Sequence, residues 1–436
     1  MPTTLIRDAT LITMNDAQEV LPGGSLLVRD GDIAAVLPAG SPLPAADRVI
    51  DGRGMVALPG LVNAHGHAPM VLFRGIADDL RLMQWLQDFI FPAEKNNVTA
   101  AFVKAGTELA ALEMIRSGTT TFVDMYYFED QVAEACDAAG LRGVLGETLI
   151  EFPAPDNKTI PEALAYSEAF LKRWAGHPRV SAAVAPHSTY LATPETLKAA
   201  RALADRHGSP ILIHLSESAD EQKTVLERYA KTPTEHLRDL GILRKGVLGA
   251  HGIWLTEGDR RILREAEVGI AHCPQSNMKL ASGTAPVRQM LAEGLRLGLG
   301  TDGAASNNDL DMFEEMATAA FLAKHATGDP TVAPANKVFE MATLGGARAL
   351  GMEDRIGSLE AGKRADIVVV DVRTPRMTPM YDPVSHLVYT TRGDDVRTTI
   401  VHGKVLMRDR KMTTLDEAAV LRDARAWAQK VRTAVN

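Results

Sequence analysis

Short apolar runs alternate along the middle of the chain with segments whose apolar residues recur at helical spacing, and eight such runs can be counted. Each run leads directly into ionisable residues, which are, in order, His65 with His67, Asp124, Glu147, His187, His214, His251, His272 and Asp302. Strands alternating with helices are typical of a parallel sheet. In a closed barrel the carboxyl ends of all strands meet on one face. The pattern therefore predicts an α/β fold, a TIM-like (β/α)8 barrel, with its active site on that face.

An open, doubly wound sheet is the alternative arrangement of such units. That fold usually carries a glycine-rich phosphate loop after its first strand, and the first run here ends instead in His65-Gly66-His67. The barrel is therefore favoured.

The two ends of the chain differ from the middle. Residues 3–56 and the stretch after residue 355 alternate apolar and polar residues between turn signals, which is typical of short antiparallel strands. The economical interpretation is one small β-domain built from residues 1–57 and 356–436, with the catalytic barrel in residues 58–355. Two independent β-appendages are the alternative.

The helical stretches carry recognisable ends. Residues 98–116 stop before a glycine, residues 193–207 open with Thr-Pro-Glu and close at Gly208, and residues 309–325 begin with acidic and end with basic side chains. Residues 68–97 are long for one strand-to-helix connection, which indicates a functional loop or lid. Its large apolar residues, Met70, Leu72, Phe73 and Trp85, are more often packing residues than ligand contacts.

A metal site is the chemistry that the strand-end residues suggest. His65 and His67 would point to one side of a strand, and His214 and Asp302 would join them if the barrel closes. Three imidazoles and one carboxylate suit Zn²⁺ and are also compatible with Fe²⁺. The competing interpretations are packed core histidines and, for Asp302, a helix N-cap.

A bound divalent cation lowers the pKa of its water to about 7. Asp302 can hold the metal and accept the proton of the water, while His251 can orient the water for attack. Glu217 follows His214 by three residues and can carry protons to the substrate and the leaving group.

Composition excludes several classes of protein. The formal charge of −8 and the lack of a basic block argue against a nucleic-acid partner. Two cysteines, Cys136 and Cys273, are too few for a disulfide framework and favour a reducing compartment. No signal peptide or membrane span is recognisable, so we expect a cytoplasmic protein without a membrane partner. A small molecule is the expected partner, and the sequence leaves a homo-oligomer open.

Several motifs together resemble the amidohydrolase superfamily, and within it the branch that deaminates 5'-methylthioadenosine and S-adenosylhomocysteine. They are Pro59-Gly-Leu-Val-Asn-Ala-His-Gly-His67, Ile213-His-Leu-Ser-Glu217, Gly249-Ala-His251, His272-Cys-Pro-Gln-Ser-Asn-Met-Lys-Leu-Ala-Ser282 and Gly300-Thr-Asp-Gly-Ala-Ala-Ser-Asn-Asn308. The resemblance covers essentially the whole chain. It implies a barrel inserted in a small β-sandwich, one metal ion per subunit, and hydrolytic release of ammonia from C6 of an adenine ring.

The resemblance also assigns residues. The metal ligands correspond to His65, His67, His214 and Asp302, and the catalytic residues to Glu217, His251 and Asp302. Substrate contacts correspond to Glu94 and His187, besides Glu217 and Asp302, with Glu94 reaching the ribose hydroxyls.

Some relatives place an arginine for the homocysteine carboxylate at the end of strand three, where this chain is aligned with Glu147. We therefore expect 5'-methylthioadenosine or adenosine to be preferred over S-adenosylhomocysteine, and an apolar lid would suit a methylthio group.

Other functions are less well supported. The same machinery could hydrolyse another heterocycle of the guanine, pterin or amino-triazine type, which would not need the ribose contacts of Glu94 and His187. A non-catalytic metal-binding barrel would need neither Glu217 nor His251. The H-x-E and P-C-x-x-C design of other zinc deaminases is absent.

Overall fold

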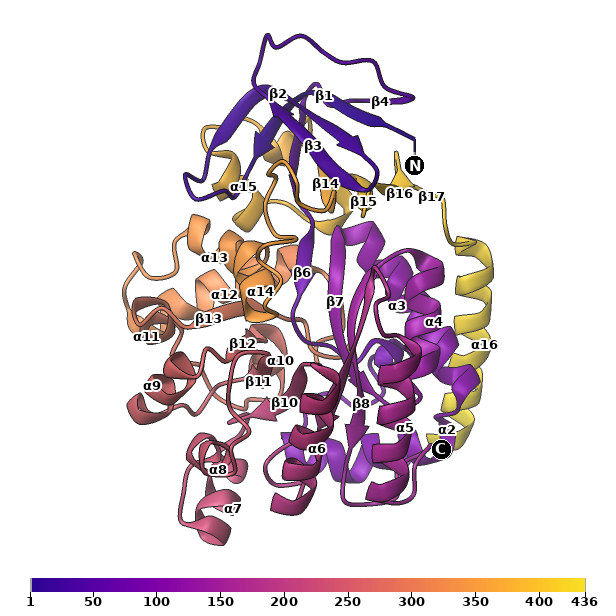
Figure 1. Ribbon diagram of the computed structural model, residues 1–436, viewed down its shortest axis with the longest axis vertical. Coiled ribbons are helices and arrows are strands. Elements are labelled where there is room, and N and C mark those ends of the chain that lie inside the picture. The colour runs from indigo at the N-terminus through magenta and orange to yellow at the C-terminus, as the bar shows by residue number, and fades with distance from the viewer. Residues whose placement is uncertain (1, 436) are drawn as a thin grey trace.

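A computed structural model describes residues 2–435 of the chain (Figure 1). Within this range, eight parallel strands form one sheet in the sequential order β6 to β13. These strands are β6 (Leu61–Asn63), β7 (Thr119–Tyr126), β8 (Arg142–Leu149), β9 (Val180–Pro186), β10 (Ile211–Leu215), β11 (Val247–His251), β12 (Gly269–His272) and β13 (Arg296–Leu299). They coincide with the eight runs, so the barrel prediction is confirmed.

The first and last strands lie next to each other. The N–H of Ala64 donates to the carbonyl of Leu299 at 2.8 Å, and the N–H of Asp302 donates to the carbonyl of His65 at 3.0 Å. Inside the barrel, side chains such as Val62, Val123 and Leu248 form their own apolar cluster. The backbone therefore joins the segments that carry the first and last predicted metal ligands.

Strands from both ends of the chain form a second, mostly antiparallel sheet at the top of Figure 1. Its described strands are β1 (Thr4–Ile12), β2 (Val20–Arg29), β3 (Asp32–Leu37), β4 (Arg48–Asp51), β5 (Met55–Pro59), β14 (Ile367–Asp371), β15 (Val396–Val401), β16 (Lys404–Arg408) and β17 (Lys411–Met412). N-terminal β5 pairs with C-terminal β14, and side chains from both ends share a separate apolar core that includes Ile6, Leu26, Ile367 and Ile400. One small β-domain made by both ends is thus confirmed.

Helices surround the barrel. They are η1 (Ala68–Phe73), α1 (Leu82–Gln84), η2 (Trp85–Ile90), α2 (Phe91–Asn97), α3 (Ala100–Ser117), α4 (Glu129–Ala139), α5 (Ile160–Arg173), α6 (Pro194–His207), α7 (Ala219–Tyr229), α8 (Pro233–Asp239), α9 (Glu257–Glu265), α10 (Pro274–Lys279), α11 (Val287–Ala292), α12 (Met312–Thr327), α13 (Ala335–Met341), α14 (Leu344–Ala349), η3 (Pro375–Met377), α15 (Pro383–Tyr389), η4 (Gly393–Asp395) and α16 (Glu417–Val435). Helices α3, α6 and α12 match the three predicted ones. In the described part of the chain, no helix is both long and apolar enough to cross a membrane.

The last helix returns to the barrel. Helix α16 runs beside α3 in Figure 1, and the Trp427 ring packs edge-on against Phe102 of α3 at 5.4 Å between centroids. The Arg116 guanidinium also pairs with Glu417 at 3.1 Å. Residues 417–435 therefore cover the barrel, although they lie within the range predicted for the β-domain. The exact division at residues 57 and 355 stays a prediction.

Candidate metal centre and substrate pocket

The four predicted metal ligands come from three widely separated stretches and meet at the carboxyl ends of the strands. His65 and His67 lie just beyond β6, His214 lies within β10, and Asp302 lies in the loop after β13. The sequence predicts that the side chains of His65 and His67 point the same way because side chains alternate along a strand. That reason is wrong, because β6 ends at Asn63 and both histidines stand on irregular backbone.

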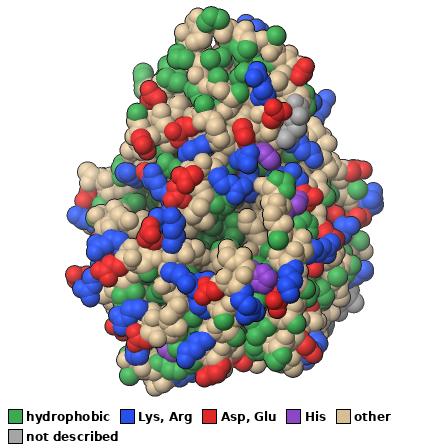
Figure 2. Space-filling view, viewed as in Figure 1, with side chains coloured by type: hydrophobic (Ala, Val, Ile, Leu, Met, Phe, Trp, Pro, Cys, Tyr) green, Lys and Arg blue, Asp and Glu red, His purple; other side chains and the backbone are tan. Residues whose placement is uncertain are grey.

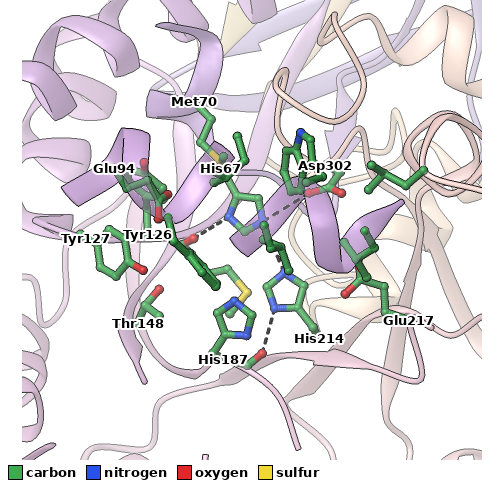
Figure 3. Close-up of a pocket in the computed structure, with 17 residues that line it drawn as sticks. His67, Met70, Glu94, Tyr126, Tyr127, Thr148, His187, His214, Glu217 and Asp302 are labelled. Atoms are coloured by element: carbon green, nitrogen blue, oxygen red, sulfur yellow. Dashed lines mark hydrogen bonds and ion pairs between the residues drawn. The ribbon is translucent and has the colours of Figure 1, made fainter. Parts of the chain in front are cut away.

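Short distances connect these side chains. Nε2 of His67 lies 3.3 Å from Oδ1 of Asp302 and 3.3 Å from Nε2 of His214 (Figure 3). Nε2 of His65 lies 3.5 Å from the same Oδ1. His65, His214 and Asp302 are buried, whereas the side chain of His67 keeps 15% exposure toward the pocket. The group is therefore compact and shielded from water on most sides.

The hydrogen bonds on the far side of two rings decide which nitrogens carry protons. Nδ1 of His67 faces the carbonyl of Met125 at 2.6 Å, and Nδ1 of His214 faces the carbonyl of His187 at 2.8 Å. Because a carbonyl only accepts, both Nδ1 atoms donate, and neutral rings then present lone pairs at Nε2. Two such lone pairs and a carboxylate oxygen converge, and a bound cation removes the repulsion between them.

The donor set fits a metal ion. The nearest ligand atoms of His65, His67 and Asp302 lie within 4.8 Å of one another, as do those of His65, His214 and His251. Nε2 of His65 and Nε2 of His251 are buried without a hydrogen-bond partner. Burial opposes ionisation of Asp302, but the close contacts of its carboxylate with the His65 and His67 imidazoles hold the pKa of this carboxyl well below its usual range. Imidazole nitrogens with one carboxylate are typical ligands of zinc.

The loop after β13 holds the Asp302 carboxylate firmly. Oδ2 accepts hydrogen bonds from the hydroxyls of Ser276 at 2.6 Å and Ser306 at 3.0 Å, while Oδ1 accepts one from the N–H of Gly303 at 2.8 Å. Asp302 has a left-handed backbone, with φ of 62°. The two serines leave Oδ1 as the oxygen that faces the imidazoles. Sequence reasoning missed both serines, although they lie in two of the quoted motifs.

Glu217 and His251 lie beside the ligand group. Oε1 of Glu217 is 3.7 Å from Nε2 of His251, and both side chains are buried. Burial raises the pKa of Glu217, so its carboxyl holds a proton more readily than an exposed glutamate. The N–H of Glu217 donates to Glu221 at 2.8 Å, and Nδ1 of His251 lies 3.0 Å from Oδ1 of Asn277. These two contacts fix the positions of a proton carrier and an imidazole next to the metal group.

A pocket opens on the ligand group, and the long segment after β6 forms much of its wall. This segment contributes Met70, Leu82, Trp85, Leu86, Ile90, Phe91 and Glu94. Predicted packing residues Leu72 and Phe73 lie instead in the apolar core. The predicted functional segment thus borders the pocket, and most of what it contributes there is apolar.

The polar residues of the pocket lie at two ends. Figure 3 shows Glu94, Tyr126, Tyr127 and Thr148 together on one side of His67, with Glu217 on the other side. Burial raises the pKa of Glu94 to about 7, and Tyr126 partly opposes this shift. Sequence reasoning missed Thr148 and the two tyrosines, because they follow Glu147 and Asp124, the residues at which the predicted runs end.

Three of the ionisable strand-end residues, Asp124, Glu147 and His272, belong neither to the ligand group nor to the lining of this pocket. Asp124 accepts a hydrogen bond from the N–H of Ala68, so it holds the backbone next to His67. Glu147 accepts from the N–H of Glu129 and the amide of Asn157, both at 3.1 Å. Glu147 therefore does not take the place of a substrate-binding arginine, and its neighbour Thr148 faces the pocket instead.

The remaining strand-end histidine and the cysteine after it are buried and make no contact with the pocket. Neither ring nitrogen of His272 has a hydrogen-bond partner, and burial lowers the pKa of this imidazole to about 3. Cys273 is a free, buried thiol.

The model of the amidohydrolase family matches residues 56–406, which includes every strand of the barrel. The chain belongs to the amidohydrolase family. The resemblance seen in the sequence motifs is therefore confirmed.

Several relatives are similar over their whole length. A 5-methylthioadenosine/S-adenosylhomocysteine deaminase of Syntrophobacter fumaroxidans is 48% identical over 98% of both chains. A 5'-deoxyadenosine deaminase of Methanosarcina acetivorans is 45% identical over 100% of both chains. Among solved structures, an adenosine deaminase from Xanthomonas campestris with bound zinc superposes with a TM-score of 0.95 at 38% identity, covering 99% of this chain and 98% of that one.

Proposed function

We propose that this protein is a zinc-dependent aminohydrolase that converts 5'-methylthioadenosine, and related adenosine nucleosides, to the inosine analogue and ammonia. The observation that carries the proposal is one pocket with two distinct ends. The metal group, Glu217 and His251 lie at one end, and the buried carboxyl of Glu94 lies at the other. A purine at the first end and a ribose at the second would fit this division.

His65, His67, His214 and Asp302 would hold the ion. When bound, Zn²⁺ acts as a Lewis acid that lowers the pKa of water to about 7. Asp302 accepts a proton from the attacking water, and His251 orients that water by a hydrogen bond. The oxygen forms a bond to C6, the C6–N bond breaks, and the amino group departs as ammonia.

Glu217 carries the protons on the substrate side. Because burial raises the pKa of Glu217, its carboxyl can donate a proton to the ring nitrogen beside C6. It then takes up the proton left on Asp302 and passes it to the leaving amino group. As the C6–N bond breaks, the new hydroxyl on C6 gives its proton to Glu217, which restores the protonated carboxyl, and C6 becomes a carbonyl carbon. In the net reaction one proton of water ends on the ring nitrogen and one on ammonia.

The other end of the pocket would recognise the nucleoside. Glu94 accepts hydrogen bonds from the ribose hydroxyls, and His187, next to the metal group, contacts the substrate. Neither lysine nor arginine occurs among the described residues that line the pocket. A homocysteine carboxylate would therefore lack a cationic partner, whereas the apolar side chains of Leu82, Trp85 and Leu86 suit a methylthio group. We expect 5'-methylthioadenosine and adenosine to be better substrates than S-adenosylhomocysteine.

The first experiment measures ammonia release and the ultraviolet change from adenine to hypoxanthine. Zinc-loaded protein receives 5'-methylthioadenosine, adenosine, S-adenosylhomocysteine and guanine in parallel. Turnover of the first two should disappear with a chelator and return with zinc. Activity on guanine alone would contradict the nucleoside assignment and reassign Glu94 and His187.

A substitution tests the proton carrier. Glu217→Gln should bind zinc normally and turn over about 10²–10⁴-fold more slowly, because the amide cannot deliver the proton. Glu227→Gln, on the exposed side of α7, is the matched control and should behave as the unchanged protein. Full turnover in Glu217→Gln would refute the proton-carrier role.

We further infer a cytoplasmic protein that acts on free nucleosides and has no nucleic-acid partner. Two buried free cysteines agree with a reducing compartment. On the face drawn in Figure 2, basic and acidic side chains are interspersed and form no extended basic stripe. A homo-oligomer stays open, and size-exclusion chromatography with light scattering would determine it.

A further inference from the structure

One ammonium group joins the segment that covers the pocket to the loop that carries Asp302. Nζ of Lys279, at the end of α10, donates to Oδ1 of Asp78 at 2.6 Å. It also contacts the carbonyl of Ala305 at 3.4 Å and the side-chain oxygen of Asn308. Asp78 lies between η1 and α1, and the other two partners follow Asp302 by a few residues. Lys279 has no part in the chemistry proposed above.

The helix that carries Lys279 also contributes two residues that contact the catalytic side chains of Asp302 and His251. Ser276 binds Oδ2 of Asp302 at 2.6 Å, and Asn277 lies 3.0 Å from Nδ1 of His251. The next residue, Leu280, lines the pocket itself. A contact to Lys279 is therefore a contact to the part of the molecule that keeps Asp302 and His251 in place.

The segment that Asp78 belongs to closes over the pocket. Residues 82–94 supply one wall, and the side chains of Trp85 and Glu94 are only 6% and 5% exposed. Residues 85–90 form a π-helix, a rare element that is frequent at functional sites. The loop before it contains left-handed backbone at Gly75 and at Asp79. This segment therefore borders the pocket that leads to the metal group.

We propose that Lys279 is a positioning residue that fastens residues 74–94 over the occupied pocket through its ion pair with Asp78. The fastening slows substrate release and aligns the wall that carries Glu94 with the catalytic groups held by α10. This inference rests on the proposed function for its substrate, but the fastening itself is a property of the protein without substrate.

The chain offers a matched pair of variants. Asp78 and its neighbour Asp79 are both exposed acids in the same loop, and within residues 2–435 the side chain of Asp79 makes no hydrogen bond or ion pair. Asp78→Asn and Asp79→Asn therefore change the net charge equally, and only the first removes the ionic contact to Lys279. Lys279→Met removes the same contact from the other side.

Hydrogen–deuterium exchange on the zinc-loaded full chain measures directly how firmly residues 74–94 are held. Amides of residues 74–94 should exchange about fivefold faster in Asp78→Asn and in Lys279→Met, the factor expected for one partly exposed ion pair. Exchange in α3 should not change, and Asp79→Asn should match the unchanged protein. Equal exchange in Asp78→Asn and Asp79→Asn would overturn the inference.

Kinetics with 5'-methylthioadenosine supply the second measurement. Asp78→Asn should raise KM about fivefold and leave kcat within about twofold, because the catalytic side chains keep their hydrogen bonds. A fall in kcat at constant KM would refute fastening as the role of this pair. If exchange responds as expected while every form is inactive on nucleosides, the proposed function fails and the fastening stands.

Discussion

Removal of the Ser276 hydroxyl should weaken zinc binding without touching any metal ligand. The hydroxyl donates to Oδ2 of Asp302 at 2.6 Å and is buried, so water cannot replace it. Ser306 donates to the same oxygen at 3.0 Å and is also placed to bond the carbonyl of Gly303 at 3.1 Å. Ser276 is therefore the stronger of two supports that direct Oδ1 toward the imidazoles.

The size of the effect follows from the charge on the acceptor. A hydrogen bond to a charged group contributes roughly 1.5–3 kcal/mol, and each 1.4 kcal/mol is a factor of about ten in affinity. Partners that orient a metal ligand typically change metal affinity by about 10–100-fold. Because Ser306 remains in the single variant, Ser276→Ala should weaken zinc binding about tenfold. The double variant with Ser306→Ala should approach 100-fold.

Competition with a chromogenic chelator measures the zinc dissociation constant independently of turnover. Ser282→Ala is the matched control, because its buried hydroxyl lies in the same stretch and has no hydrogen-bond partner. It should bind zinc as tightly as the unchanged protein. Equal zinc affinity in Ser276→Ala and Ser282→Ala, or a larger effect from Ser306→Ala alone, would show that Ser276 does not orient the carboxylate.

Three other perturbations have defined outcomes. Burial raises the pKa of Glu94 to about 7, so its carboxyl becomes neutral as the pH falls through that value. The kcat/KM for ribonucleosides should therefore fall as the pH is lowered through about 7. In a pH profile of Glu94→Gln, this acidic decrease in kcat/KM should be absent. Arg142 binds Asp366 through two hydrogen bonds of 3.0 and 3.1 Å, with both side chains buried between barrel and β-domain. Arg142→Met should cost roughly 3–5 kcal/mol in unfolding experiments, and adding Asp366→Leu should recover most of it. A Cβ at Gly300 would lie 2.7 Å from the backbone nitrogen of His65, so Gly300→Ala should displace that ligand and reduce bound zinc below one ion per chain, as metal analysis would show.

The barrel and its strand ends could be predicted because they rest on periodicity. Buried parallel strands read as apolar runs, and a closed sheet brings their carboxyl ends to one face whatever their separation in sequence. The sequence alone therefore predicts His214 and Asp302 beside His65. The same reasoning placed Asp124, Glu147 and His272 on that face but could not tell that their side chains avoid the pocket.

The supporting residues could not be predicted, since their roles depend on contacts between loops. Ser276 and Ser306 are common residue types with no periodic signal, and they meet only because α10 and the loop after β13 pack together. Tyr126 and Thr148 sit within apolar strands, where a pocket-facing and a core-facing side chain look alike. Residues of this kind follow from coordinates alone.

Backbone conformation at the strand ends explains why alternation fails where the chemistry lies. Leu248 of β11 faces the barrel interior, so regular alternation would turn His251 outward. Yet its ring lies 5.3 Å from that of His65, because His251 adopts a left-handed backbone with φ of 75°. Ser216, just before Glu217, and Asp302 are left-handed too, with φ of 53° and 62°. Such conformations are unfavourable for residues other than glycine and cluster at functional sites. The strain at these three strand ends is what directs Glu217, His251 and Asp302 toward one point.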